Sequence, residues 1–130
     1  MLPRLDPDRY AAAASCCDVA LDSIGWSGCN STLESLPHHL PIVTLEAEFM
    51  RGRHCAAILR MMGVPDTIAA TVDAYVAIAT RLAGSPAERQ ALRARMQAGA
   101  PKVYCDRACV SALEDLLQRA VCSGPAKSAG

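Results

Sequence analysis

The sequence of 130 residues lacks an excess of charge of either sign. Lys and Arg together number 13, and so do Asp and Glu, which leaves a formal net charge of zero. Proteins that track the phosphate backbone of nucleic acids usually carry a clustered basic surface and a basic pI. We therefore expect no nucleic-acid partner.

Long apolar runs are also missing. No stretch approaches the roughly 20 apolar residues that span a bilayer. Residues 1–6 have neither the basic start nor the apolar segment of a signal peptide. We expect a cytoplasmic protein with no membrane partner.

The seven cysteines lack the spacing of a metal or disulfide motif. Their number is odd, Cys16 and Cys17 are adjacent, and Cys105 and Cys109 are four residues apart, so no pair has the C-x-x-C spacing of a zinc knuckle. The chain is rich in Ala and Leu rather than in loop residues. We interpret the cysteines as reduced thiols that pack as small, buried or half-buried hydrophobic residues.

The first half of the chain has the pattern of a strand–helix–strand unit. After a short helix over residues 10–17, opened by Asp6-Pro7, an apolar segment over residues 18–24 predicts a buried strand that runs into a glycine-rich loop. A helix follows from about Asn30 or Ser31, and residues 41–45 form a β-branched strand. Such crossovers belong to parallel sheets.

The second half is predominantly helical. Helical spacing of apolar residues predicts four helices: over residues 51–62, from Thr71 or Asp73 to Gly84, from the Ser85-Pro86 cap to about Gly99, and from Asp106 to about Val121. We expect an α/β fold, a partial Rossmann-like domain with a short parallel sheet. We expect residues 1–122 to form this domain and residues 123–130, which lie outside the residues described below, to form a flexible tail. Two or three strands are few for such a sheet, so we expect the chain to be part of something larger.

The turn over residues 28–32 is the strongest candidate for a binding site. It follows a predicted strand and opens a helix, which is where α/β folds bind ligands. Free amide groups and the hydroxyls of Ser31 and Thr32 suit a phosphate or pyrophosphate. The alternative is a capping box, in which Ser31 and Glu34 only cap their own helix. The spacing alone favours this second interpretation.

An ordered set of motifs changes that balance. Leu21-Asp22-Ser23, the run 26–32, Leu40-Pro41-Ile42-Val43-Thr44 and the run 49–59 closely resemble the C-terminal catalytic region of the O-linked N-acetylglucosamine transferase family, including bacterial proteins related to SPINDLY. The resemblance extends from about Leu5 to Val121. It implies a GT-B glycosyltransferase, in which two Rossmann-like domains face each other across a cleft and the C-terminal one binds a UDP-sugar without a metal or other cofactor.

The resemblance also assigns roles by position. Aligned on Gly28, the diphosphate positions are Asn30 and Ser31, and the ribose position is Glu34. Tyr10 falls about where the family places a ring near the uracil, although core packing is the commoner role of such an aromatic. The predicted nucleotide-binding residues are thus Tyr10, Gly28, Cys29, Asn30, Ser31, Thr32 and Glu34. No catalytic residue is predicted.

The sequence departs from the family pattern at several positions. Asn30 replaces a hydroxyl, which the adjacent Thr32 can supply, and Glu34 replaces a common Asp. Glu46-Ala47 stands where many members have Pro-Gly. Arg51 and Arg53 are candidates to offer positive charge to the diphosphate, and the alternative for Arg53 is that it ties its loop to the following helix. We interpret His38-His39 as a solvated loop.

Other parts of such an enzyme are not found in this sequence. The family's proposed base, its lysine near the diphosphate, its acceptor cleft and its helical repeats lie upstream. We therefore expect no turnover by this chain alone, contact with a protein acceptor only through those domains, and self-association through unpaired sheet edge and apolar surface. The alternatives are a non-catalytic α/β protein-interaction module and a thiol-based sensor that uses Cys16-Cys17 or Cys105 and Cys109.

Overall fold

A three-stranded parallel sheet lies at the centre of the fold. The computed structural model describes residues 3–104 and 106–122. Strands β1 (Ala20–Leu21), β2 (Ile42–Leu45) and β3 (Ile68–Ala69) lie side by side in the order β1-β2-β3. Both pairs of neighbouring strands are parallel.

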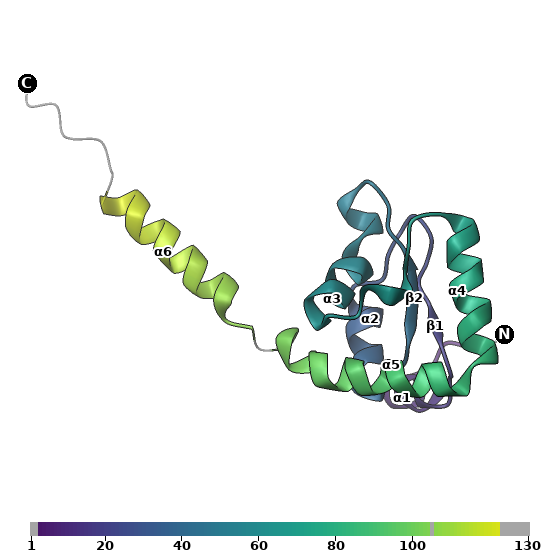
Figure 1. Cartoon of the computed structure of the whole chain (residues 1–130). Helices are drawn as coiled ribbons and strands as arrows, with labels where there is room; N and C mark the ends of the chain where they lie inside the picture. The colour runs from purple at the N-terminus through teal and green to yellow at the C-terminus, as the bar shows by residue number, and fades with distance from the viewer. Residues whose placement is uncertain (1–2, 105, 123–130) are drawn as a thin grey trace, which may run out of the picture.

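Helices make up most of the rest of the described chain (Figure 1). The α-helices are α1 (Pro7–Ser15), α2 (Asn30–Ser35), α3 (His54–Met62), α4 (Val72–Gly84), α5 (Pro86–Gly99) and α6 (Ala108–Cys122). The 3-10 turns are η1 (Leu36–His38), η2 (Met50–Gly52), η3 (Pro65–Thr67) and η4 (Ala100–Lys102). This arrangement confirms the expected fold class, a short parallel sheet followed by a predominantly helical half.

Local capping signals explain where several helices begin and end. The Asp6 side chain accepts a hydrogen bond from the amide of Arg9 at the start of α1. Thr71 and Ser85 cap α4 and α5 in the same way. Gly63 ends α3 in the left-handed conformation with φ of 76°, which glycine adopts at little cost. The starts predicted at Asp6, Thr71 and Ser85 are confirmed.

The hydrophobic core lies between the sheet and helices α3, α4 and α5. Ile42, Val43 and Thr44 of β2 are all buried, as expected for a central parallel strand covered on both faces. The side chains of Leu59, Leu82 and Met96, from α3, α4 and α5, are at most 1% exposed. Burial of these side chains is the main force that holds the layers together.

Two strand predictions need correction. The predicted strand over residues 18–24 is reduced to Ala20–Leu21, because the Asp22 carboxylate binds groups of the following loop and the chain turns at Gly25, where φ is 83°. The strand β3 was not predicted at all. It has only two residues and forms through pairing with β2, which leaves no periodic pattern in the sequence.

Helix α6 extends away from the body in Figure 1. None of its residues is buried. Its exposed large apolar side chains are Val110, Leu113, Leu116, Leu117 and Val121. No helix among the described residues is both long and apolar enough to cross a membrane.

The cysteines differ from the expectation of buried thiols. Of the six free cysteines in the described residues only Cys55 is buried, and Cys16, Cys17, Cys29, Cys109 and Cys122 are exposed. The interpretation as buried or half-buried hydrophobic residues is therefore wrong for these five. They lie at a helix end, in a loop or on the exposed α6, where no core is available to cover them. Cys105, which was also considered as part of a thiol pair, lies outside the described residues.

Candidate functional site

The loop between β1 and α2 is organised by the carboxylate of Asp22. One oxygen of this side chain accepts hydrogen bonds of 2.7 Å from the hydroxyls of Ser27 and Thr44, and the other accepts the amide of Gly28 at 2.7 Å. Thr44 belongs to the neighbouring strand β2 and is fully buried. Asp22 therefore fastens the far end of the loop to the carboxyl end of the sheet.

Further bonds attach the loop to the surrounding helices. The Ser27 hydroxyl accepts the amide of Cys55 at 2.9 Å, and the Ser27 amide donates to the carbonyl of Arg51 at 2.8 Å. The Tyr75 hydroxyl of α4 donates to the carbonyl of Asp22 at 2.9 Å. The loop is thus fixed from β2, α3 and α4, which makes a rigid platform in front of α2.

Gly28 contributes space to this turn, and its amide is not free to bind a ligand. A Cβ at this position would collide with the Ser31 hydroxyl and would lie 3.4 Å from Asp22 Oδ1. The Gly28 amide already donates to Asp22. Its carbonyl accepts the hydroxyl of Thr32 at 2.8 Å, and Thr32 is only 4% exposed. Thr32 therefore stabilises the turn from inside.

The start of α2 contradicts the capping-box interpretation. The helix begins at Asn30, its N-cap is Cys29, and no side chain caps it. Ser31 is already the second helical residue, so it cannot act as the cap. The first amides of a helix have no helical acceptor, which leaves those of Asn30 and Ser31 available, and both residues are exposed.

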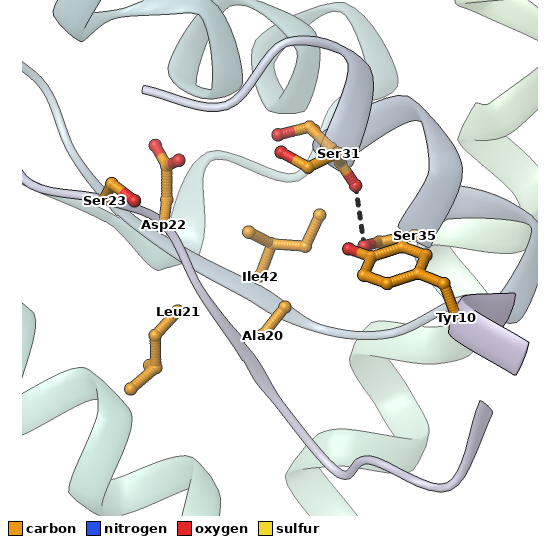
Figure 2. A pocket seen from close by; sticks show the side chains of 9 residues that line it. Tyr10, Ala20, Leu21, Asp22, Ser23, Ser31, Ser35 and Ile42 are labelled. Atoms are coloured by element: carbon orange, nitrogen blue, oxygen red, sulfur yellow. Dashed lines mark hydrogen bonds between the residues drawn. The ribbon is translucent and has the colours of Figure 1, made fainter. Parts of the chain in front are cut away.

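A pocket of about 110 Å³ opens beside this helix. Figure 2 shows Asp22 and Ser23 at one side of it and Tyr10 and Ser35 at the other. Ser31 and Thr32 also line it. The dashed line in Figure 2 marks the bond of 2.8 Å from the Ser35 hydroxyl to the Ser31 carbonyl.

A larger pocket of about 600 Å³ shares Tyr10 with the first one. Its lining includes Glu34 and His38. Of the seven predicted site residues, Tyr10, Ser31, Thr32 and Glu34 therefore line one or both pockets. Gly28, Cys29 and Asn30 line neither, although Cys29 and Asn30 are exposed next to Ser31.

The loop between β2 and α3 contains a fixed charge cluster. Glu46 accepts two hydrogen bonds of 2.6 Å from Arg60 of α3 and one of 3.3 Å from Arg53. The bonds from Arg60 are the main reason why the pKa of Glu46 falls to about 2. Arg51 lies over the Phe49 ring, 5.0 Å from its centroid. Of the two roles considered for Arg53, this geometry favours tying the loop to α3.

The two histidines are not a solvated loop. His38 ends η1 and lines the larger pocket, while His39 has a left-handed φ of 50°. Both side chains are half-buried. The interpretation is wrong because the turn η1 packs against α5 instead of projecting into solvent.

Comparison with known proteins places the chain in a family. A sequence profile described as glycosyl transferase family 41 matches residues 9–105, which is more than half of the chain. The chain belongs to this family. A search of curated protein sequences gave no significant match.

A solved structure supports the assignment to family 41. The chain is similar to a lysine-to-methionine variant of the Thermobaculum terrenum O-GlcNAc transferase, with 32% sequence identity and a TM-score of 0.76. The match covers 91% of this chain but only 22% of that one. The resemblance inferred from the motifs and the fold class are thereby confirmed, and the chain corresponds to about a fifth of the length of that relative.

Sequence reasoning missed the role of Asp22. The Leu21-Asp22-Ser23 motif contributed to the resemblance, but no function was attached to the carboxylate. The available signal was its place between a strand and a glycine loop. The bond partners themselves, Ser27 and Thr44, are separated from it by 5 and 22 residues, so only the folded chain shows them together.

Proposed function

We propose that this chain forms part of the donor site of a glycosyltransferase, where it holds the UDP part of a UDP-sugar. The hexose or N-acetylhexosamine is then transferred to a protein acceptor. The observation that carries the proposal is that Tyr10, Ser31 and Glu34 line two pockets that share Tyr10, in a chain of family 41. The smaller pocket reaches Asp22 and Ser23, directly after the carboxyl end of β1.

The diphosphate is assigned to the start of α2. Asn30 and Ser31 offer exposed side chains and amides that lack a helical acceptor. When the glycosidic bond breaks, negative charge grows on the β-phosphate of the leaving UDP. Fixed hydrogen-bond donors stabilise that charge without having to reorganise. This is the chemical contribution that we assign to the turn.

The nucleoside is assigned to the larger pocket. Its volume of about 600 Å³ lies within the range of small-molecule sites. In this arrangement the Glu34 carboxylate accepts hydrogen bonds from the ribose hydroxyls, and the Tyr10 ring lies against the uracil. Tyr10 is 40% exposed, so its ring has a free face for such a contact.

The remainder of the enzyme supplies the other half of the reaction. We propose that the acceptor cleft and the base come from upstream domains, that the donor binds without a metal ion, and that this chain alone turns over no sugar. The chain spans 22% of the relative's length, which supports the view that the site is completed elsewhere.

The role of Glu34 can be tested with a pair of matched variants. A hydrogen bond to a charged group contributes about 1.5–3 kcal/mol, so Glu34→Ala should weaken UDP binding about tenfold or more. Glu114→Ala removes the same side chain from the exposed helix α6 and should leave binding unchanged. Dissociation constants for UDP from NMR titration provide the measurement.

Two results would argue against the assignment. Equal UDP affinity of Glu34→Ala and wild type would remove Glu34 from the site. No UDP binding by the folded wild-type chain at millimolar concentration would refute the proposal that this chain holds the nucleotide by itself.

A further inference from the structure

We infer that Asp22 is a positioning residue that fixes the phosphate-binding turn at the end of β1. The inference rests on the proposed function, because it states how the turn is kept in a shape that admits a diphosphate. Asp22 lines the smaller pocket, but the family resemblance assigns no ligand contact to it. It acts through Gly28 and Ser27, the residues before the N-cap of α2.

The hydrogen bonds of the carboxylate leave little freedom to the turn. Oδ1 receives the Gly28 amide and Oδ2 receives both the Ser27 and the Thr44 hydroxyl, each at 2.7 Å. Ser27 and Gly28 belong to the turn, whereas Thr44 belongs to the sheet. One side chain thus joins the turn to the sheet with short, charge-assisted bonds.

In the described part of the chain, the carboxylate of Asp22 is held by hydrogen-bond donors. Among residues 3–104 and 106–122, no Lys or Arg forms an ion pair with this carboxylate. Its negative charge is therefore stabilised by hydrogen-bond donors alone. The same charge adds to the effect of burial that raises the pKa of Cys55 to about 11, so the thiol beneath the turn stays protonated.

A general folding defect and a displaced turn should reduce ligand affinity in different ways. If Asp22 only supported the fold, its removal would weaken every ligand of the site to the same degree. A residue that sets the turn acts on the diphosphate and leaves the nucleoside pocket, lined by Tyr10 and Glu34, in place. Uridine affinity therefore measures the state of the nucleoside pocket, and the additional affinity of UDP measures the state of the turn.

The experiment compares UDP and uridine binding to the full chain by NMR titration. Asp22→Ala should weaken UDP binding more than tenfold while uridine binding changes less than about twofold. Asp22→Asn should lie between wild type and Asp22→Ala, because its amide oxygen still accepts the Gly28 N–H but its NH2 group cannot accept the Ser27 and Thr44 hydroxyls. Asp115→Ala, on the exposed helix α6, is the control and should bind both ligands as wild type does.

Two outcomes overturn the inference. One is wild-type UDP affinity in Asp22→Ala, and the other is an equal loss of UDP and uridine affinity. Should Asp22→Ala fail to fold, Thr44→Val replaces it and should weaken UDP more than uridine, because it removes one donor to Oδ2.

Amide hydrogen exchange at Gly28 separates this inference from the proposed function. Slow exchange in wild type and fast exchange in Asp22→Ala, which removes the acceptor of this amide, would support the positioning role, even if wild type bound no UDP and the nucleotide proposal failed. Equally fast exchange in both proteins would overturn the positioning role directly.

Discussion

Adding a methyl group at Gly28 should weaken UDP binding while hardly changing the stability of the fold. The atom closest to the new Cβ would be the Ser31 hydroxyl, which is exposed and can rotate away. We therefore expect Gly28→Ala to change the free energy of unfolding by less than about 1 kcal/mol. Because the hydroxyl is displaced from its position, UDP binding should weaken about tenfold. Urea unfolding and NMR titration measure the two effects, and unchanged UDP affinity would contradict the account.

The ion cluster at Glu46 predicts a pH dependence of stability. Its pKa is lowered from 4.5 to about 2 in the folded chain. The ionised group therefore adds stability above its unfolded pKa of 4.5, and this is lost as the pH falls toward 2. Wild type should be more resistant to urea than Glu46→Gln at about pH 6, and the two should converge near pH 2.

The control for this prediction lies on the same loop. Glu48 is exposed and takes part in no ion pair of the described residues. Glu48→Gln should match wild type across the whole range. A gap between wild type and Glu46→Gln that stays constant down to the lowest pH would mean that the ion pairs do not stabilise the fold.

Sequence reasoning succeeds for features that depend on neighbouring residues. The caps at Asp6, Thr71 and Ser85 follow from side chains that bind amides three residues later, so their signals are local. The capping box at Ser31 and Glu34 was misleading because the N-cap of α2 is Cys29, two residues before Ser31. The hydrogen bonds that Asp22 accepts could not be predicted, because Thr44 comes close to Asp22 only through the pairing of β1 with β2.

Helices and strands also differ in how far the sequence alone predicts them. Helices α3, α4 and α5 extend over many residues with an apolar stripe, and their sequence patterns predicted them. Strand β3 consists of Ile68 and Ala69 alone and exists because Thr44 and Leu45 lie opposite. A strand of two residues has no periodicity to detect, so it becomes visible only in the folded sheet.

The crossing of α5 over the end of α3 predicts a destabilising variant. A Cβ on Gly99 would collide with the carbonyl oxygen of Met62 and lie 3.0 Å from its carbonyl carbon and Cα. This is rigid backbone, so Gly99→Ala should lower the free energy of unfolding by about 1–3 kcal/mol. Urea unfolding followed by circular dichroism measures the effect.

Gly84 provides the matched control at the end of α4. A Cβ there meets nothing within 4 Å. Because Ala is favoured over Gly in helices by about 0.5–1 kcal/mol, Gly84→Ala should be neutral or slightly stabilising. Equal stability of the Gly99 and Gly84 variants would mean that the two helices are not in close contact.

On the scale of the whole molecule, the apolar face of α6 predicts association. The side chains of Leu113, Leu116 and Leu117 are 55–56% exposed, and exposed apolar surface of this kind is usually covered by a partner. We expect the sedimentation coefficient of the isolated chain to rise with protein concentration. The double variant Leu116→Lys, Leu117→Lys should abolish that rise, and a monomeric wild type over roughly hundredfold dilution would contradict the expectation.

The central claim is that this part of a family 41 chain binds the nucleotide of the donor. The most direct test is a two-dimensional NMR titration of the full chain with UDP. Our account predicts shifts, even with millimolar affinity, at the amides of Gly28, Asn30, Ser31 and Glu34. It predicts none at the exposed α5 residues Gln90, Ala94 and Gln97. A folded chain whose amides at these four positions do not respond to UDP would contradict it.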